Sequence, residues 1–219
     1  MLDSQGFDLW ADDYDRDVGL SDESDRYPFA GYREILNDIY NRILSRRGDE
    51  APRVLDLGFG TGTLTTRLYG RGCRIWGQDF SPHMIARARE KMPEAELYQG
   101  DLSKGLVDAL SAQKYDAIVA TYSLHHLTDG QKANFLRELL PLLNPGGSIY
   151  IGDVAFATQE ELERCREKAG TDWDDDEIYF VVDRLKEQFP WLTFTRHSDC
   201  AGLIELTQID GSAAPPPQN

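Results

Sequence analysis

Cysteine is scarce in this sequence, and long apolar runs are absent from it. Its three cysteines, Cys73, Cys165 and Cys200, are odd in number and far apart, so they support neither a disulfide framework nor a zinc knuckle and fit a reducing cytosol. No stretch of about 18 apolar residues occurs, and no early apolar run follows a basic start, which is the pattern of a secretory signal. We therefore expect a cytoplasmic protein that neither crosses nor binds a membrane.

Basic residues are also in short supply. The chain has 23 Lys and Arg against 38 Asp and Glu, which gives a net charge of −15. Such a balance repels phosphate backbones and anionic membrane surfaces, so nucleic acid is not an expected partner. The acidic residues gather in residues 1–25 and 172–177, and both runs are interpreted first as solvated surface.

What the sequence does contain is enough apolar material for one domain. Of its 219 residues, 41% are hydrophobic, which suits a single globular domain with a proper core. Short apolar runs predict strands, and periodic segments between them predict helices. The predicted strands are residues 53–57, 73–78, 95–99, 117–121, 148–154, 192–197 and 203–208. The predicted helices within this part are residues 29–45, 81–91, 131–143, 159–168 and 179–188.

The order of these segments predicts the fold class. Strands that alternate with helices indicate an α/β protein, in which a parallel sheet is covered by helices on both faces. The last two strands are too close together for a crossover helix, so they should pair antiparallel. We expect a seven-stranded, mostly parallel sheet with one antiparallel strand near an edge.

Two segments flank the predicted core of residues 49–210. Phe7, Trp10 and Tyr14 share one face of a short amphipathic helix. This helix and the next one make residues 1–48 a predicted N-terminal helical lid. Residues 211–219 contain three consecutive prolines and are expected to form a disordered tail.

The most informative stretch is a glycine turn after the first strand. Gly58, Gly60 and Gly62 follow an apolar run that contains Asp56. Glycine permits a sharp turn and lets a ligand lie against bare backbone, and a following helix directs its first N–H groups into the turn. The turn therefore predicts a nucleotide-like cofactor. Its spacing differs from the Gly-x-Gly-x-x-Gly dinucleotide fingerprint, and no Gly-Lys-Ser/Thr loop for nucleoside triphosphates occurs.

Acidic residues stand at the ends of the next two strands. Asp79 follows the glycine turn by about twenty residues, where an acid can accept both hydroxyls of a ribose; the alternative is a helix cap before Ser81. Met84 on the following helix could pack against an adenine ring or simply in the core. Asp101, after the third strand, could accept the adenine amino group.

These motifs, in this order and spacing, resemble those of the class I S-adenosylmethionine-dependent methyltransferases of the small bacterial type. The resemblance covers nearly the whole chain. It runs from Phe7-Asp8-x-Trp10-Ala11 through the glycine turn, Asp79-Phe80-Ser81-Pro82 and Gly100-Asp101 to Asn144-Pro145-Gly146-Gly147. Phe59 in the turn and Gln78 before the ribose acid depart from the family pattern.

The resemblance implies a Rossmann-like fold and S-adenosylmethionine as the cofactor. Gly58 and Gly60 would line its methionine part, and Asp79 would hold its ribose. Phe80 and Met84 would contact the adenine ring, and Asp101 with Leu102 its edge. Acids and aromatic faces such as Tyr14 or Tyr122 would stabilise the sulfonium cation. The predicted cofactor-binding residues are Tyr14, Asp56, Gly58, Gly60, Gly62, Asp79, Phe80, Met84, Asp101, Leu102 and Ser123.

Residues 121–127, after the fourth strand, should lie beside the sulfonium. His125 and His126 are the predicted catalytic residues, because an acceptor hydroxyl, thiol or protonated amine must lose a proton and histidine titrates in the useful range. The alternative is that one histidine orders the loop or caps the next helix while the other lies behind it. No metal site is expected, since adjacent side chains rarely converge on one ion and no third ligand is evident.

The predicted function is methyl transfer from S-adenosylmethionine to a small molecule, with the nucleophilic atom and the oligomeric state left open. In this prediction the opening helix closes over the cofactor, with Tyr14 at its methionine end, and the acidic residues 172–177 border the acceptor pocket and disfavour anionic acceptors. The alternatives are a non-catalytic S-adenosylmethionine-binding sensor or assembly protein, and a nicotinamide-dependent oxidoreductase.

Overall fold

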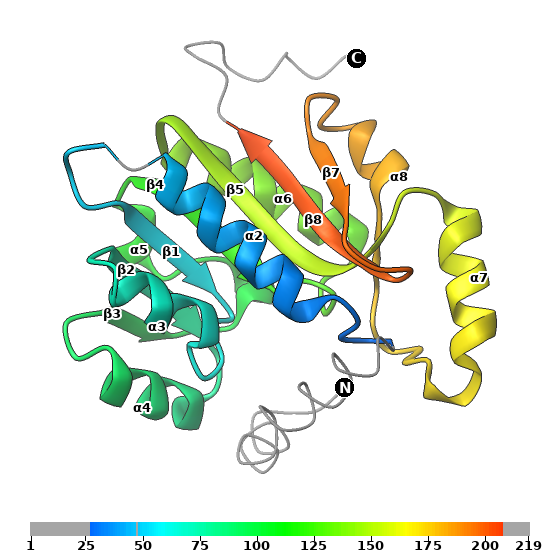
Figure 1. Ribbon diagram of the computed structural model, residues 1–219, viewed down its shortest axis with the longest axis horizontal. Coiled ribbons are helices and arrows are strands. Elements are labelled where there is room, and N and C mark those ends of the chain that lie inside the picture. Colours follow the sequence, from blue (N-terminus) through cyan, green and yellow to red (C-terminus); the bar gives the residue numbers. More distant parts are fainter. Residues whose placement is uncertain (1–26, 47, 208–219) are drawn as a thin grey trace.

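The fold is an eight-stranded sheet between two layers of helices. The computed structural model describes residues 27–46 and 48–207. The strands follow the order β3-β2-β1-β4-β5-β8-β7 (Figure 1). Strand β6 pairs with β5 outside this path. Their bounds are β1 Arg53–Leu57, β2 Arg74–Asp79, β3 Glu96–Gln99, β4 Tyr115–Thr121, β5 Leu143–Phe156, β6 Phe180–Val181, β7 Thr193–Arg196 and β8 Ala201–Thr207.

Strand direction confirms the predicted fold class. Strands β1 to β5 run parallel to one another, whereas β8 runs antiparallel to both β5 and β7. The reversed strand therefore lies next to the edge, because the short connection from β7 to β8 cannot hold a crossover helix. The two-residue strand β6, parallel to β5, was not predicted.

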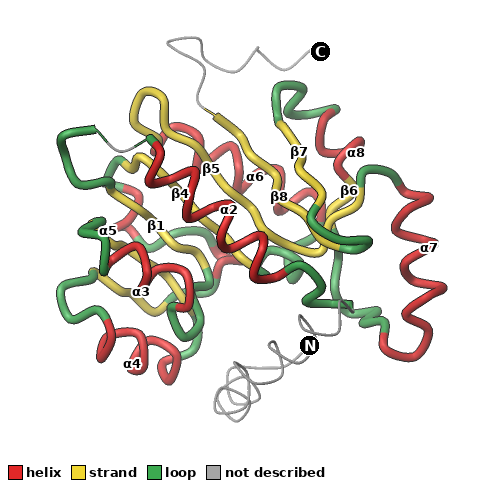
Figure 2. The backbone as a smooth tube through the Cα atoms, in the orientation of Figure 1, coloured by secondary structure: helices red, strands yellow, loops and turns green. Residues whose placement is uncertain are grey.

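Helices cover both faces of the sheet, and each face has its own hydrophobic cluster. Helices α2, α3 and α4 pack on one face, and α5, α6 and α8 pack on the other. Figure 2 shows α2 crossing the front of the sheet, with α6 behind it. The helix bounds are α2 Tyr32–Ser45, α3 Thr63–Tyr69, α4 Pro82–Lys91, α5 Asp108–Ser111, α6 Asp129–Leu139, α7 Gln159–Ala169 and α8 Val182–Lys186.

Helix α2 lies very close to strand β5. A Cβ added at Gly152 would come within 2.3 Å of the Ile35 side chain, so only glycine allows this approach. Farther along the helix, Arg42 and Arg46 bind the two carboxylate oxygens of Glu205 on β8 at 2.7 and 2.8 Å. Apolar contact and charge together hold α2 on the sheet.

Two predicted helices end or begin at other residues than expected. The predicted helix 179–188 starts late, because Phe180 and Val181 extend to pair with Ala155 and Phe156 of β5, and residues of these types favour strands. The predicted helix 131–143 ends at Leu139, followed by a 3₁₀ turn at Leu140–Leu142. Pro141 cannot supply the amide hydrogen that a continuing α-helix needs.

The carboxyl ends of the central strands meet at one edge of the sheet. Leu57 of β1 is in register with Gln78 of β2 and with Ala120 of β4. Loops that leave these strands therefore start side by side, as required for a site at this edge. The predicted helix with Tyr14, most of the predicted lid and the tail 211–219 lie outside the described residues. Among residues 27–46 and 48–207, no helix is both long enough and apolar enough to cross a membrane.

Candidate active site

The glycine turn joins β1 to α3 at the carboxyl edge. Gly58, Gly60 and Gly62 all have positive φ, at 71°, 54° and 78°, a region that side chains disfavour. A Cβ at Gly58 would lie 2.4 Å from Cβ of Ser123, whereas a Cβ at Gly60 would have no atom within 4 Å. Gly58 is therefore needed for packing, and Gly60 faces open space that a ligand can fill.

The two departures from the family pattern have structural roles. Phe59 is buried, and a Cβ at Gly77 would approach its ring to 2.6 Å, so a glycine on β2 makes room for it. The amide of Gln78 donates to the Gly105 carbonyl and accepts from the Val107 amide, both at 2.9 Å. Both residues stabilise the framework around the turn.

Asp79 connects the glycine turn to helix α4. One carboxylate oxygen accepts from the Gly60 amide at 2.8 Å, and the other accepts from the Ser81 amide at 2.9 Å. The helix cap is Ser81, whose hydroxyl accepts from the Met84 amide, so the alternative of Asp79 as the cap is wrong. Because each carboxylate oxygen has more than one lone pair, Asp79 can still accept hydrogen bonds from ribose hydroxyls.

Asp56 is a buried acid directly before the turn. Its side chain is 1% exposed, and Oδ1 has no hydrogen-bond partner within the part of the chain that the structure describes. Burial raises the pKa of Asp56 to about 7; the Thr65 side chain lowers it, and the charge of Asp79 raises it further. A buried oxygen without a partner is costly, so the cradle fits a ligand with donor or cationic groups, as S-adenosylmethionine has.

The predicted adenine contacts differ in how accessible they are. Phe80 and Leu102 are partly exposed and Asp101 is exposed. Asp101 accepts from the Ser103 amide at 2.9 Å and so starts a 3₁₀ turn at Leu102–Lys104. Met84 is 3% exposed, so it packs in the protein interior in this structure. Contacts of these side chains with adenine stay predictions, as does that of Tyr14, which lies outside the described residues.

The end of β4 lies against the glycine turn. The Ser123 hydroxyl donates to the Leu57 carbonyl at 2.7 Å, and Tyr122 has a φ of 50°, a rare value for a bulky residue. The Tyr122 ring packs against Phe29 and Tyr32, with centroids 5.2 and 5.3 Å away. Backbone strain of this kind is common at functional sites, and here it occurs three residues before His125.

His125 is buried between two carboxylates. Its Nδ1 lies 2.8 Å from Asp153 Oδ1, and its Nε2 lies 3.4 Å from Glu177 Oε1. Burial by itself lowers the pKa of His125, but Asp153 and then Glu177 outweigh it, and the pKa is raised. His126, whose ring centroid is 4.3 Å from that of His125, has its pKa lowered to about 4, mainly by burial and then by the charge of His125.

Sequence reasoning placed Glu177 within the acidic run 172–177 beside the acceptor pocket but did not pair it with the histidines. The Ile178 amide donates to the His125 carbonyl at 2.8 Å, which holds Glu177 over the imidazole. One ligand atom from each of His125, His126 and Glu177 lies within 4.8 Å of the others. The structure thus provides the third group whose absence argued against a metal site. No local pattern could have paired Glu177 with the histidines, because only the fold brings these two segments together.

Known proteins resemble this chain in both sequence and fold. The profile of the methyltransferase domain family matches residues 54–147. An uncharacterized methyltransferase of Geobacillus kaustophilus (strain HTA426) is 38% identical over 192 residues, covering 84% of each chain. Another, of Geobacillus sp. (strain WCH70), is 36% identical over 214 residues, covering 92% of this chain and 96% of the relative.

Solved structures share the fold of this chain. Magnesium protoporphyrin IX methyltransferase from Synechocystis PCC 6803, with bound SAH, matches at a TM-score of 0.65 and 16% identity, covering 83% of this chain and 85% of that one. N-methyltransferase NodS from Bradyrhizobium japonicum WM9, in complex with S-adenosyl-l-homocysteine, matches at a TM-score of 0.59 and 18% identity, covering 82% of this chain and 88% of that one. At these identities the structural matches establish the fold, and the sequence relatives establish the family. The chain belongs to the class I S-adenosylmethionine-dependent methyltransferases, and its cofactor is S-adenosylmethionine.

Proposed function

We propose that this methyltransferase acts on a small molecule, which it holds where β4 and β5 end. The observation that carries the proposal is the short path from the cofactor cradle to the histidines: Ser123 bonds to the end of β1, and His125 follows two residues later. S-adenosylmethionine supplies a methyl group that its sulfonium already activates, so the protein mainly has to align a nucleophile and exclude water.

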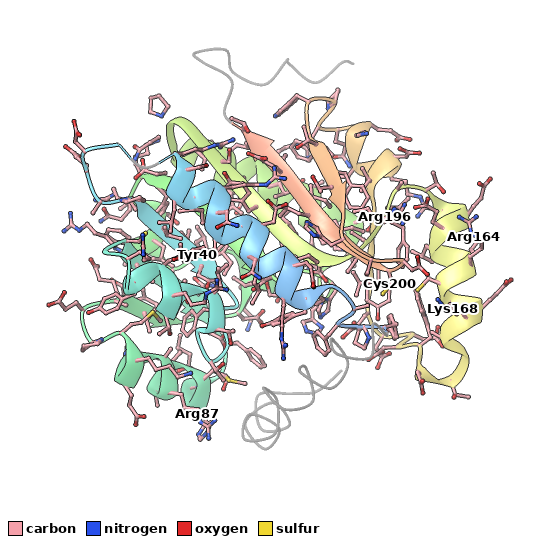
Figure 3. All side chains as sticks on the ribbon, in the orientation of Figure 1. Tyr40, Arg87, Arg164, Lys168, Arg196 and Cys200 are labelled. Carbon is pink, nitrogen blue, oxygen red and sulfur yellow. The ribbon has the colours of Figure 1, made fainter. Side chains whose placement is uncertain are left out.

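A cavity near this edge supports a small acceptor. It has a volume of about 470 Å³ and lies between α7 and the β7–β8 hairpin, within the range of small-molecule sites. Arg164 and Lys168 line it from α7, and Arg196 and Cys200 line it from the hairpin (Figure 3). The acids Glu161, Asp172 and Asp199 line it as well. Tyr27 forms part of its wall and reaches the histidine cluster through a hydroxyl contact with Tyr179.

His125 and His126 are the groups that we assign to the acceptor side of the site. Both nitrogens of His125 face carboxylates, Asp153 and Glu177, so His125 does not stand alone as a base. It acts together with Glu177 and His126, which is partly exposed. An Asp153→Asn change should therefore lower kcat while leaving the affinity for S-adenosylhomocysteine unchanged; equal losses in both would indicate a purely structural role.

The N-terminal residues before the described part belong to the same proposal. Tyr14 closes over the methionine end of the cofactor, as its family motif implies. A Tyr14→Ala variant should bind S-adenosylmethionine at least several-fold more weakly than the wild type in calorimetry. Unchanged affinity together with unchanged turnover would reject this role.

The acidic residues 172–177 border the acceptor site in this proposal and disfavour anionic acceptors. Asp172 lines the cavity, and Glu177 belongs to the histidine cluster, which supports that placement. The acceptor range of an Asp172→Asn, Asp174→Asn double variant tests it. Anionic acceptors should gain turnover relative to neutral ones, and an unchanged range would count against the proposal.

A labelling experiment tests the proposed function. The protein is incubated with methyl-labelled S-adenosylmethionine and a cell extract separated into small-metabolite, protein and RNA fractions, with a Gly60→Ala variant as the control. Label should appear in a discrete small product, and only with the wild-type protein. Label confined to protein or RNA would contradict a small acceptor, and binding without any transfer would favour the non-catalytic sensor.

A further inference from the structure

We infer that His125, His126 and Glu177 form a binding site for one divalent first-row transition metal ion. The site itself follows from the geometry of these residues. Its role in presenting the acceptor rests on the proposed function.

The spacing of His125 and Glu177 is compatible with two ligands of one metal ion. His125 Nε2 and Glu177 Oε1 are 3.4 Å apart, beyond the usual N–H···O range of about 2.7–3.2 Å. Two ligands of a tetrahedral ion, each about 2.0–2.1 Å from the metal, lie about 3.3 Å from each other. The nearest ligand atom of His126 completes the group within 4.8 Å.

Asp153 fixes the orientation of the first ligand. Asp153 is fully buried, and its Oδ1 lies 2.8 Å from His125 Nδ1 while accepting from the Val154 amide at 2.8 Å. When His125 binds a metal ion, its single proton would stay on Nδ1, donated to Asp153, and the lone pair of Nε2 would be available to the ion on the side of Glu177. A carboxylate behind a histidine is the usual second partner of a metal-binding imidazole.

Glu177 also has a polar neighbour. The Tyr179 side chain interacts with the Glu177 carboxylate, and its hydroxyl is bonded to the Tyr27 hydroxyl. Asp153 beside His125 and Tyr179 beside Glu177 thus give two of the three ligands a polar neighbour, which is common in metal sites.

The neighbouring cation does not occupy the space between the ligands. Lys132 is 1% exposed; its ammonium donates to the Ile178 carbonyl and lies 4.4 Å from the Phe180 ring centroid. No cationic side chain of the described residues thus lies between His125 Nε2 and the Glu177 oxygen. A divalent cation there would interact favourably with the Glu177 carboxylate.

The ligand set indicates the class of ion and its use. Two imidazoles and one carboxylate suit Zn²⁺, Fe²⁺ or a similar ion rather than Ca²⁺ or Mg²⁺. Three protein ligands leave a position open, as in catalytic rather than structural zinc sites. An acceptor oxygen or sulfur bound there would lose its proton more easily and become a better nucleophile.

Zinc titration of the full chain tests the inference. After dialysis against a chelator, calorimetry and elemental analysis should find one Zn²⁺ per chain. Glu177→Gln and His126→Asn should each weaken binding at least 100-fold, and Tyr179→Phe about 10-fold, since losing a partner behind a ligand costs roughly 10–100-fold. His83→Gln, on the exposed part of α4, and Cys200→Ser control for other histidines and for thiols, and neither should change binding.

Two results would overturn the inference. One is that the metal-free protein takes up no Zn²⁺ at micromolar concentrations, and the other is that Glu177→Gln and His126→Asn bind Zn²⁺ as tightly as the wild type. Circular dichroism verifies that each variant is folded. S-adenosylhomocysteine affinity and methyl transfer are measured on the same metal-free sample, so that intact transfer without metal removes the role of the ion in presenting the acceptor and leaves the proposed function standing.

Discussion

At the scale of single residues, Gly60 provides the sharpest test of the cradle. Gly60 and Gly146 both have positive φ, at 54° and 76°, and a Cβ at either would meet nothing within 4 Å. Changing each to Ala should therefore cost a similar amount of stability, about 1–2 kcal/mol. Only Gly60→Ala places a methyl group in the cofactor space, so calorimetry should show at least a tenfold weaker affinity for S-adenosylhomocysteine.

The comparison of the two glycine variants contains its own control. Gly146 lies between Leu143 and Ser148 of β5, where the register with β4 shifts, at the opposite edge from the site, so Gly146→Ala reports the backbone cost alone. Equal cofactor affinity in the two variants, with equal stability loss by urea unfolding, would mean that Gly60 faces solvent rather than the ligand.

Asp56 gives a prediction about pH. Its pKa is raised from 3.8 to about 7 in the folded protein. Between these values the folded state keeps a proton that the unfolded state has released, so this residue makes stability fall as pH rises. The side chain of an Asp56→Asn variant cannot ionise. The free energy of unfolding of this variant should therefore rise by about 2–4 kcal/mol relative to that of the wild type between pH 4 and pH 8.

Urea unfolding of both proteins at several pH values measures this gain. The other titrating groups are common to the two proteins and cancel in the difference. A difference in unfolding free energy that stays constant over that range would show that Asp56 is not a buried, protonated acid.

At the scale of elements, the contact between α2 and β5 limits which substitutions the fold accepts. Gly152→Ala would drive a methyl group to 2.3 Å from the Ile35 side chain, and overpacking of this kind costs about 1–3 kcal/mol. Gly130→Ala, in the first turn of α6 with nothing within 4 Å, should instead be neutral or stabilising by up to about 1 kcal/mol. Thermal unfolding of both variants checks that the two stability changes have opposite signs. Equal stability changes would contradict the close packing of α2 on β5.

Elements with a strong local pattern were predictable, and those that depend on distant partners were not. The run 53–57 and the glycines after it specify strand β1 and its turn by themselves, because apolar patterning and turn chemistry act locally. Phe180 and Val181 were expected in a helix, yet they pair with β5. That pairing is decided by a strand far away in the sequence, which no local periodicity records.

At the scale of the whole molecule, net charge should affect how fast the cofactor arrives. The chain carries −15, and S-adenosylmethionine has one net positive charge at neutral pH, whereas S-adenosylhomocysteine has none. The association rate of the former should fall several-fold from about 0.01 to 0.5 M salt, because screening removes the attraction. Stopped-flow fluorescence with both ligands measures this, and an equal salt dependence for the two would contradict electrostatic steering.

The site as a whole also has a part that the sequence predicts and a part that it does not. Its cofactor half was predictable, since Asp56, Gly58, Gly60 and Asp79 belong to motifs that are contiguous or follow at a fixed spacing. Its acceptor half was predictable only in part. His125 and His126 were recognised after β4, and residues 172–177 were placed beside the acceptor. The pairing of Glu177 with the histidines was not predicted, because the Ile178–His125 backbone bond that places it forms only in the folded chain.

The central claim is that the open backbone at Gly60 and the carboxylate of Asp79 hold the adenosyl cofactor. A crystal structure of the protein with S-adenosylhomocysteine tests it most directly. The account predicts both ribose hydroxyls within hydrogen-bond distance of Asp79, the amino-acid part of the ligand over Gly58–Gly60, and its sulfur on the side of His125. A ligand bound elsewhere, with the glycine turn empty, would contradict it.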